Sequence, residues 1–197
     1  KLKGGLLSSV SLISSNKTKV INEYHDYKAT SYCNKCGTDL YSKYKSQLLS
    51  ERDEVSRSLQ KLIDAIPVVS THSPLNWDYD ILSMVTGQST TGTGVIAEFT
   101  SSFTDLFGVQ SGRFNKKLKG GEDICFAQLR KQALDLGGNA VIATNIDYSE
   151  VGGDKGILMV CMGGTAIKLK NTNILGQDRA DTIDELAQLN NRRKILS

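Results

Sequence analysis

The sequence predicts an α+β protein, and three patterns support this class. A helical spacing of apolar residues runs from Phe114 to Leu136 and ends at Gly137-Gly138, which favours a helix C-cap. Two mostly apolar stretches, 139–151 and 156–170, follow it. They are joined by the turn sequence "GGDKG" and therefore predict a β-hairpin. Ahead of the helix, "YDILSMVTG" has the composition of another strand.

Bulk composition describes a globular chain of one ordinary domain with appendages. The 197 residues are 39% hydrophobic and 23% charged, and the net charge of +3 is too small and dispersed to indicate a nucleic-acid-binding protein. Two of the four cysteines stand alone among apolar residues, which favours a reducing compartment, and we expect a cytoplasmic protein without a membrane span. The chain begins with Lys1 and stops inside a helical pattern, so we expect both ends to be trimmed.

The remaining segments divide the chain into modules. Residues 1–46 are polar, with short β-prone stretches and a tight cysteine turn. Residues 47–66 carry an apolar stripe with Ser50 and Asp53 as an N-cap, which predicts a connecting amphipathic helix. Further predictions are a strand at "PVVSTHS", a helix over 95–107, and a C-terminal helix in 179–197 that opens with a capping box, Thr182 to Glu185.

The pair Cys33 and Cys36, in "CNKCG", is the strongest chemical signal. Two thiolates at this spacing can hold one Zn²⁺, but a structural zinc needs four ligands. His25 is a candidate third ligand, and a missing pair could precede Lys1. A redox role is the rival interpretation. We favour structural zinc because no convincing helix follows the pair and the polar segment needs a staple.

The central region resembles the YbjQ-like family, also called the "putative heavy-metal-binding domain", over roughly residues 67–170. The resemblance implies a YbjQ-like/dodecin-like subunit, with a small antiparallel sheet backed by a long helix, that forms a ring, usually a pentamer. It rests most strongly on four motifs: Val85-Thr86-Gly87, Leu136-Gly137-Gly138-Asn139-Ala140, Asp147-Tyr148 and Gly164-Thr165-Ala166.

Two appendages are similar to other modules. The cysteine knuckle resembles half of a zinc ribbon, and the tail 179–197 resembles the start of a SHOCT domain, a short helical module. The stretch "GQSTTGTG" has two glycines at P-loop spacing but lacks the lysine that contacts phosphate. In view of the resemblance, we interpret its glycines as residues of special backbone geometry.

Other candidate sites are weaker. Cys125 and Cys161 are predicted to be core residues rather than metal ligands. A Ser-His-Asp set built on His72 has nothing to fix its geometry. The acidic group of Asp147, Glu150 and Asp154 could bind a hard cation, but we favour an ordinary solvated turn for it. Asp147, Tyr148 and Arg113 remain candidates for a subunit interface or a ligand contact.

These patterns together predict a non-enzymatic, homo-oligomeric scaffold that displays zinc-ribbon and SHOCT-like modules for a partner. Multivalent display on a ring would raise avidity for that partner. A protein is favoured over nucleic acid as the partner because the charge is modest. The alternative is a metal-binding or metal-handling protein, with a metal or small ligand bound at the subunit interface.

Overall fold

The computed structural model describes residues 11–90, 113–151 and 157–197, and these divide into two compact units. The first comprises residues 1–57 and 193–197. The second comprises residues 58–192. The helix predicted over 95–107 lies outside the described residues. In the described ranges, no helix combines the length and apolar character that crossing a membrane requires.

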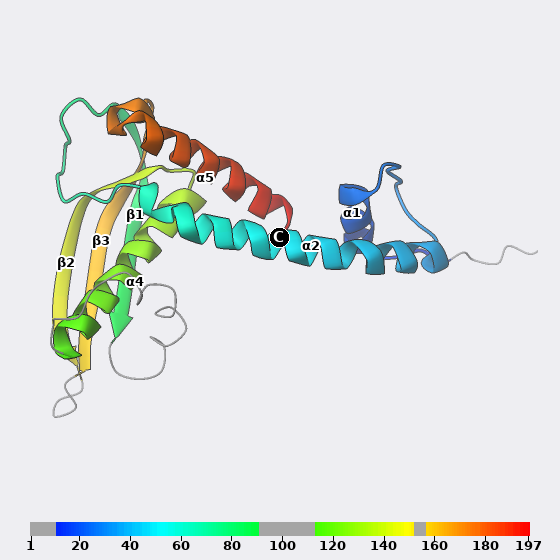
Figure 1. The fold of residues 1–197 in the computed structure, drawn as a ribbon, viewed down its shortest axis with the longest axis horizontal. Coiled ribbons are helices and arrows are strands. Elements are labelled where there is room, and N and C mark those ends of the chain that lie inside the picture. The colour runs from blue at the N-terminus through cyan, green and yellow to red at the C-terminus, as the bar shows by residue number, and fades with distance from the viewer. Residues whose placement is uncertain (1–10, 91–112, 152–156) are drawn as a thin grey trace, which may run out of the picture. The chain divides into compact units, whose positions relative to one another are not determined.

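The second unit contains the predicted sheet. Strands β1 (Tyr79–Thr90), β2 (Ala140–Val151) and β3 (Ile157–Leu169) lie in the order β1-β3-β2, and both pairs are antiparallel (Figure 1). The hairpin is confirmed by the pairing of Ala140 with Ile167 at one end and of Val151 with Ile157 at the other. β3 is the central strand, which explains why its sequence is so apolar.

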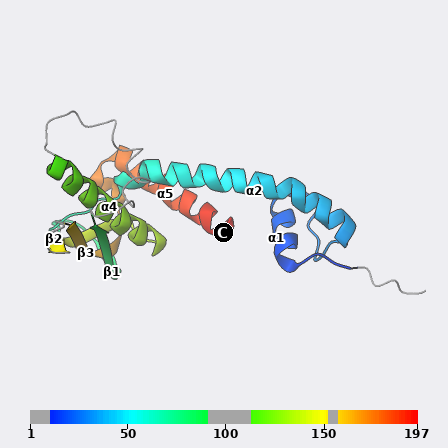
Figure 2. The same ribbon diagram turned by 90° about the horizontal axis from the view of Figure 1, so that it is seen from below.

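The long helix α4 (Arg113–Asp135) packs along one face of this sheet, as the family resemblance implied (Figure 2). Gly137 ends it with a positive φ of 83°, and the amides of Gly137 and Gly138 donate to the carbonyls of Leu134 and Ala133. The predicted glycine C-cap is therefore confirmed. Helix and sheet share one core cluster: Val85, Cys125, Leu129, Ala133, Val141, Val160, Met162 and Ala166.

Glycine is required at position 87 by close packing, and not by an unusual backbone conformation. It is buried in β1, and its φ does not lie in the positive range. A Cβ at this position would stand 2.7 Å from the carbonyl oxygen of Cys125 and 2.8 Å from Cδ1 of Leu129. The glycine thus lets the α4 backbone approach the strand. The other glycines of "GQSTTGTG", at 92 and 94, lie outside the described residues.

The segment after Pro67 is less regular than predicted. It forms a single parallel bridge, Val68 with Val141, instead of a strand. Its backbone still covers the edge of β2, because the amides of Val69 and Thr144 donate to the carbonyls of Val141 and Val69. A second apolar cluster forms at this end of the sheet: Ala140, Ile142, Ile167 and Leu169, with Val69, Trp77, Tyr79, Ala143 and Leu175 packed against it.

Two glutamines of α4 occupy the outer edge of β1. The side-chain amide of Gln128 accepts from the backbone N–H of Gln88 at 2.8 Å and donates to its carbonyl at 3.2 Å. Gln132 does the same at Thr86, at 3.3 and 2.5 Å. Each glutamine therefore replaces the backbone pairing that a fourth strand would supply, which protects the edge from pairing with another chain.

Helix α2 (Asn34–Leu62) is longer than the predicted connecting helix, and the 3-10 turn η1 (Ile63–Ala65) follows it. The predicted cap at Ser50 is wrong, because that residue lies well inside α2. The predicted apolar stripe holds at its C-terminal end, where Leu59, Ile63 and Ile66 are buried.

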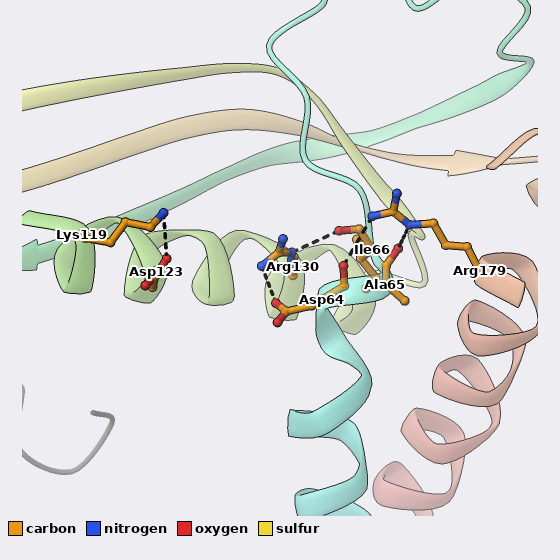
Figure 3. Close-up of polar contacts among 7 residues, drawn as sticks. All are labelled: Asp64, Ala65, Ile66, Lys119, Asp123, Arg130 and Arg179. Carbon is orange, nitrogen blue, oxygen red and sulfur yellow. Dashed lines mark hydrogen bonds and ion pairs between the residues drawn. The ribbon is translucent and has the colours of Figure 1, made fainter. Parts of the chain in front are cut away.

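Two arginines hold the turn that ends α2. Arg130 of α4 donates from Nη1 to Oδ1 of Asp64 at 2.6 Å and from Nε to the carbonyl of Ile66 at 3.1 Å (Figure 3). Arg179 donates from Nε to the carbonyl of Ala65 at 2.7 Å. Burial lowers the pKa of the Arg130 guanidinium, and the Asp64 carboxylate opposes that effect. The arginines satisfy carbonyl groups that a helix end leaves without partners.

Replacing Arg130 with alanine is expected to lower the free energy of unfolding by about 2–3 kcal/mol, because the Ile66 carbonyl loses a charge-assisted partner. The matched control is Lys131→Ala, which removes an exposed i,i+4 pair with Asp135 and should change stability by less than about 0.5 kcal/mol. Chemical denaturation of both variants measures the difference. Equal stabilities would show that the arginine contacts contribute nothing.

The C-terminal helix α5 (Gln177–Ile195) begins before the predicted capping box, after a short 3-10 turn η4 (Thr172–Leu175). The predicted cap is therefore wrong. Thr182 lies inside the helix, and its hydroxyl donates to the carbonyl of Asp178 at 2.8 Å. The predicted apolar stripe is present, with Ile183 and Leu186 buried. Asn190 adds a buried bond from Nδ2 to the carbonyl of Leu134 at 2.8 Å, at the end of α4.

The first unit is helical where β structure was expected. Helix α1 (Ser15–Tyr24) lies beside the N-terminal part of α2 (Figure 1). Among its described residues, from Ser11 onward, the β pairing consists of one antiparallel bridge, between Leu12 and Cys33. The contacts between the helices are aromatic and polar: Tyr24 stacks on Tyr44, and its hydroxyl donates to Oε2 of Glu51 at 2.7 Å. The described residues of this unit hold together without a β-ribbon.

Candidate functional site

Cys33 and Cys36 lie at the start of α2. Cys33 is the residue directly before the helix, and Cys36 stands in its first turn. The backbone N–H of Cys36 donates to the Cys33 sulfur at 3.4 Å. The Cys36 side chain is exposed, and that of Cys33 is half-buried. Both thiols are free and reachable from solvent, so the structure brings the two predicted ligands together.

The helix start makes the two thiols unequal. The hydrogen bond from the Cys36 amide, supported by the amides of Lys35 and Gly37, lowers the pKa of Cys33. The thiol–thiol hydrogen bond and the charge of Cys33 raise the pKa of Cys36. Free helical N–H groups stabilise an anion, which is the physical cause of the first shift. The Cys33 sulfur is therefore the better thiolate.

The backbone around the pair is fixed by its neighbours. The amide of Ile13 donates to the carbonyl of Tyr32 at 3.1 Å, and the amide of Asn34 donates to the carbonyl of Ser11 at 2.7 Å. These bonds flank the bridge at Cys33. Gly37 packs so closely that a Cβ there would stand 2.8 Å from Cγ2 of Ile13. The segment before α1 thus anchors the first turn of α2.

His25 has its own partners. It caps the C-terminal end of α1, and its ring stacks on Tyr32 and lies tilted against Tyr44. Its Nδ1 accepts from the amide of Tyr27 at 3.2 Å. Within the described ranges, no group of three or more His, Cys, Asp or Glu side chains is arranged to hold a metal ion. The two thiols therefore provide two soft ligands, which suits a thiophilic metal but does not complete a tetrahedral zinc site by themselves.

The helical setting of the pair was missed by the sequence analysis, although a signal was present. Leu40, Tyr41, Tyr44 and Leu48 follow Cys36 at helical spacings, and all four are partly buried in the structure. The high content of serine and tyrosine obscured this stripe, because both are weaker helix formers than alanine or leucine and tyrosine is also common in strands.

The two isolated cysteines differ in their surroundings. Cys125 is fully buried on α4, and its thiol donates to the carbonyl of Val160 at 3.4 Å. Desolvation raises the pKa of Cys125 to about 11. Cys161 lies on β3 opposite Asp147 and is half-buried. Cys125 is thus the core residue that the sequence predicted, whereas Cys161 is only partly enclosed.

The raised pKa of Cys125 predicts a pH dependence of stability. The unfolded thiol ionises near 9.0 and the folded thiol near 11, so unfolding releases a proton between these values. The contribution is complete below pH 9 and is lost as the pH rises toward 11. We expect Cys125→Ala to remove part of the fall in unfolding free energy over this window. Denaturation of both proteins at pH 8, 9 and 10 measures it, and parallel curves would contradict the expectation.

The remaining candidate residues do not gather into one site. The Tyr148 hydroxyl donates to Oε1 of Glu122 at 2.9 Å, which raises the pKa of the phenol. Lys119 forms an ion pair with Glu122 at 3.5 Å. A second ion pair joins Lys119 to Asp123 at 3.2 Å (Figure 3). Asp147 is exposed and accepts a long bond from Asn145.

Several of the predicted site residues lie wholly or partly outside the described ranges. Arg113 is the first residue of α4, but its side chain and that of Glu150 are not described, and Asp154 lies outside the described ranges. His72 is exposed in the segment between Pro67 and β1. No geometry links it to a nucleophile among the residues that the structure describes.

Comparison with known proteins concerns the second unit. The chain is similar to a crystal structure of a protein of unknown function from Pediococcus pentosaceus ATCC 25745, which belongs to the DUF74 family. The sequence identity is 18%, the alignment covers 53% of this chain and 98% of that one, and the TM-score is 0.36. Residues 67–170, which include β1, α4, β2 and β3, match the family YbjQ_1, described as "Putative heavy-metal-binding". This match spans more than half of the 197 residues, so the chain belongs to the YbjQ_1 family.

Proposed function

We propose that this protein binds a thiophilic metal ion through Cys33 and Cys36. The observation that carries the proposal is the pair itself: two solvent-accessible thiols at the start of α2, with the backbone amide of Cys36 donating to the Cys33 sulfur at 3.4 Å. Thiolates are the ligands that soft ions such as Cu(I), Cd²⁺ and Zn²⁺ prefer. The family description, which names heavy-metal binding, applies to residues 67–170, so it supports a metal-related function of the chain but does not extend to this pair.

Zinc is the metal that we propose first, in a structural role. A tetrahedral Zn²⁺ needs four ligands, and the described part of the chain brings two together. A second copy of the chain would supply another Cys33 and Cys36 and complete a four-thiolate site. This arrangement would place the metal between subunits. His25 would have to give up its bond with the Tyr27 amide in order to act as a third ligand.

Titration of the reduced protein with Cd²⁺ or Co²⁺ tests the proposal, because thiolate ligation produces charge-transfer absorption. The double variant Cys33→Ser/Cys36→Ser should lose this absorption. The matched control, Cys125→Ala/Cys161→Ser, should keep it. One metal per two chains would support the shared site, and one metal per chain would support ligation within a single chain. Full absorption in the first double variant would place the metal elsewhere and overturn the proposal.

A homo-oligomeric scaffold is a second proposal, and exposed apolar side chains on β1 favour it. Ile81 is 71% exposed and Met84 is 73% exposed, and the nearby Leu75 is 87% exposed. Such a group is typical of a surface that contacts another copy or a partner. In this proposal a ring, pentameric by family resemblance, displays the N-terminal module and the SHOCT-like tail to a protein partner, without catalysis, in the cytoplasm.

Native mass measurement tests the scaffold. A single closed assembly that survives dilution to low micromolar concentration would support it. Met84→Glu should dissociate that assembly, whereas the substitution of an exposed polar neighbour, Ser83→Glu, serves as the control. A folded monomer would exclude the ring and leave the metal proposal standing.

A further inference from the structure

We infer that Cys33 and Cys36 also form a redox-active dithiol, which closes into an intramolecular disulfide by exchange with a small-molecule disulfide such as oxidised glutathione. Cys33 acts as the attacking thiol and Cys36 as the resolving thiol. The inference concerns the metal-free protein and is independent of the proposed metal. The site is the pair of sulfur nucleophiles, which the helix start merely orients.

The placement of the two cysteines permits a bond between them. They stand three residues apart, across the boundary where α2 begins, so both side chains leave the same turn of backbone. The backbone N–H of Cys36 lies 3.4 Å from the Cys33 sulfur, so the second residue is already next to the first thiol. A disulfide requires the Cβ atoms to lie about 3.5–4.5 Å apart. Because the contact of the Cys36 amide with the Cys33 sulfur already joins the two residues, closing the bond requires rotation of the two side chains toward each other.

The contacts at the two sulfurs assign the roles. The sulfur of Cys33 accepts the backbone N–H of Cys36 at 3.4 Å, and such a donor stabilises a thiolate. Cys36 is exposed, so its thiol can attack a mixed disulfide that has formed at Cys33. Neither residue is sealed in a core, in contrast to Cys125, which is fully buried. Of the four cysteines, only this pair combines access to solvent with a hydrogen bond that stabilises a thiolate.

The surrounding backbone keeps the pair in place during exchange. The bridge between Leu12 and Cys33, with the amide of Asn34 donating to Ser11 at 2.7 Å, holds the residue before the helix. Cys36 is held by α2 itself. Preorganised thiols raise the effective concentration of the second thiol at the first, which favours an intramolecular disulfide over a lasting mixed one.

The thiol–disulfide exchange takes two steps. The Cys33 thiolate attacks one sulfur of the glutathione disulfide, the S–S bond breaks, and one glutathione thiolate leaves. Cys36 then loses its proton to solvent and attacks the Cys33 sulfur, and the second glutathione thiolate leaves. The protein pair loses two electrons and two protons, and the glutathione disulfide gains them. Each chain reacts once, so the step is a switch rather than a turnover.

The test is oxidation of the full chain with oxidised glutathione in the presence of a chelator, followed by acid quench and mass spectrometry. The wild-type protein should lose two hydrogens and retain no glutathione, and peptide mapping should join Cys33 to Cys36. Cys36→Ser should accumulate a glutathione adduct at Cys33. Cys33→Ser should form its adduct at Cys36 about tenfold more slowly. Cys161→Ser, the control, should behave as wild type.

Two results would overturn the inference. One is wild-type protein that keeps four free thiols or a stable glutathione adduct under conditions that oxidise a free dithiol. The other is equal adduct formation in the two single variants, which would remove the assigned roles. Mapping the first adduct on quenched wild-type protein gives the same answer without any substitution, in case a variant fails to fold. Metal titration is a separate measurement, so failure here leaves the proposed metal function untouched.

Discussion

Gly87→Ala is expected to lower the free energy of unfolding by about 2–3 kcal/mol, and Gly87→Val by more. The added Cβ would stand 2.7 Å from the carbonyl oxygen of Cys125, which is backbone and cannot turn aside. To accommodate it, α4 would have to move off β1. That movement would disturb the core cluster built on Val85, Leu129 and Val160.

The control for Gly87 is another glycine, in α4. A Cβ at Gly120 would meet nothing within 4 Å, so Gly120→Ala should raise stability by about 0.5–1 kcal/mol through helix propensity. Urea denaturation followed by the fluorescence of Trp77, the single tryptophan, measures both variants. If Gly87→Ala were as stable as wild type, α4 could not lie as close to the strand as described.

Asn139→Ala is expected to cost about 2–4 kcal/mol, because it leaves two buried backbone groups without partners. The Asn139 side chain, 4% exposed, donates from Nδ2 to the carbonyl of Leu169 at 3.1 Å and accepts the Leu169 N–H at 2.6 Å. Its amide thus extends the pairing between β2 and β3 by one step. Loss of this pairing would loosen the end of the sheet.

The matched substitution for Asn139 lies in β2, the strand that directly follows it. Asn145→Ala removes an exposed amide whose contact with Asp147 is 3.5 Å long, and it should change stability by less than about 0.5 kcal/mol. Amide hydrogen exchange at Leu169 adds a local measurement, since its N–H should lose protection in Asn139→Ala. Retained protection would mean that another group satisfies this amide.

Much of the second unit could be predicted from sequence because its patterns are local and agree with one another. The apolar spacing of α4, the glycine cap at Gly137 and the turn of the hairpin each favour the same structure. Asn139 illustrates the limit. Its buried pairing with Leu169 depends on a partner thirty residues away, and no local pattern signals it.

The N-terminal unit was predicted poorly for a physical reason. Its helices bury few large aliphatic side chains and rely on contacts such as those of Tyr24 with Tyr44 and Glu51. Composition of this kind looks like a loop or a metal-stapled ribbon. The candidate residues Cys33 and Cys36 were chosen for their spacing in the sequence, but their surroundings differ from the expected turn because α2 begins at Asn34, between them. The spacing in the sequence identified the pair of cysteines, but only the structure showed that a helix begins between them.

The amides of Gln128 and Gln132 limit how copies of this protein can join. A filament that grows by strand pairing needs two unpaired sheet edges on every copy, so that each copy can pair with one neighbour on either side. Here the edge along Thr86 and Gln88 is already occupied, and on the opposite edge the segment after Pro67 covers the beginning of β2. Both edges therefore restrict growth by strand addition, and a closed assembly must be built through other surfaces.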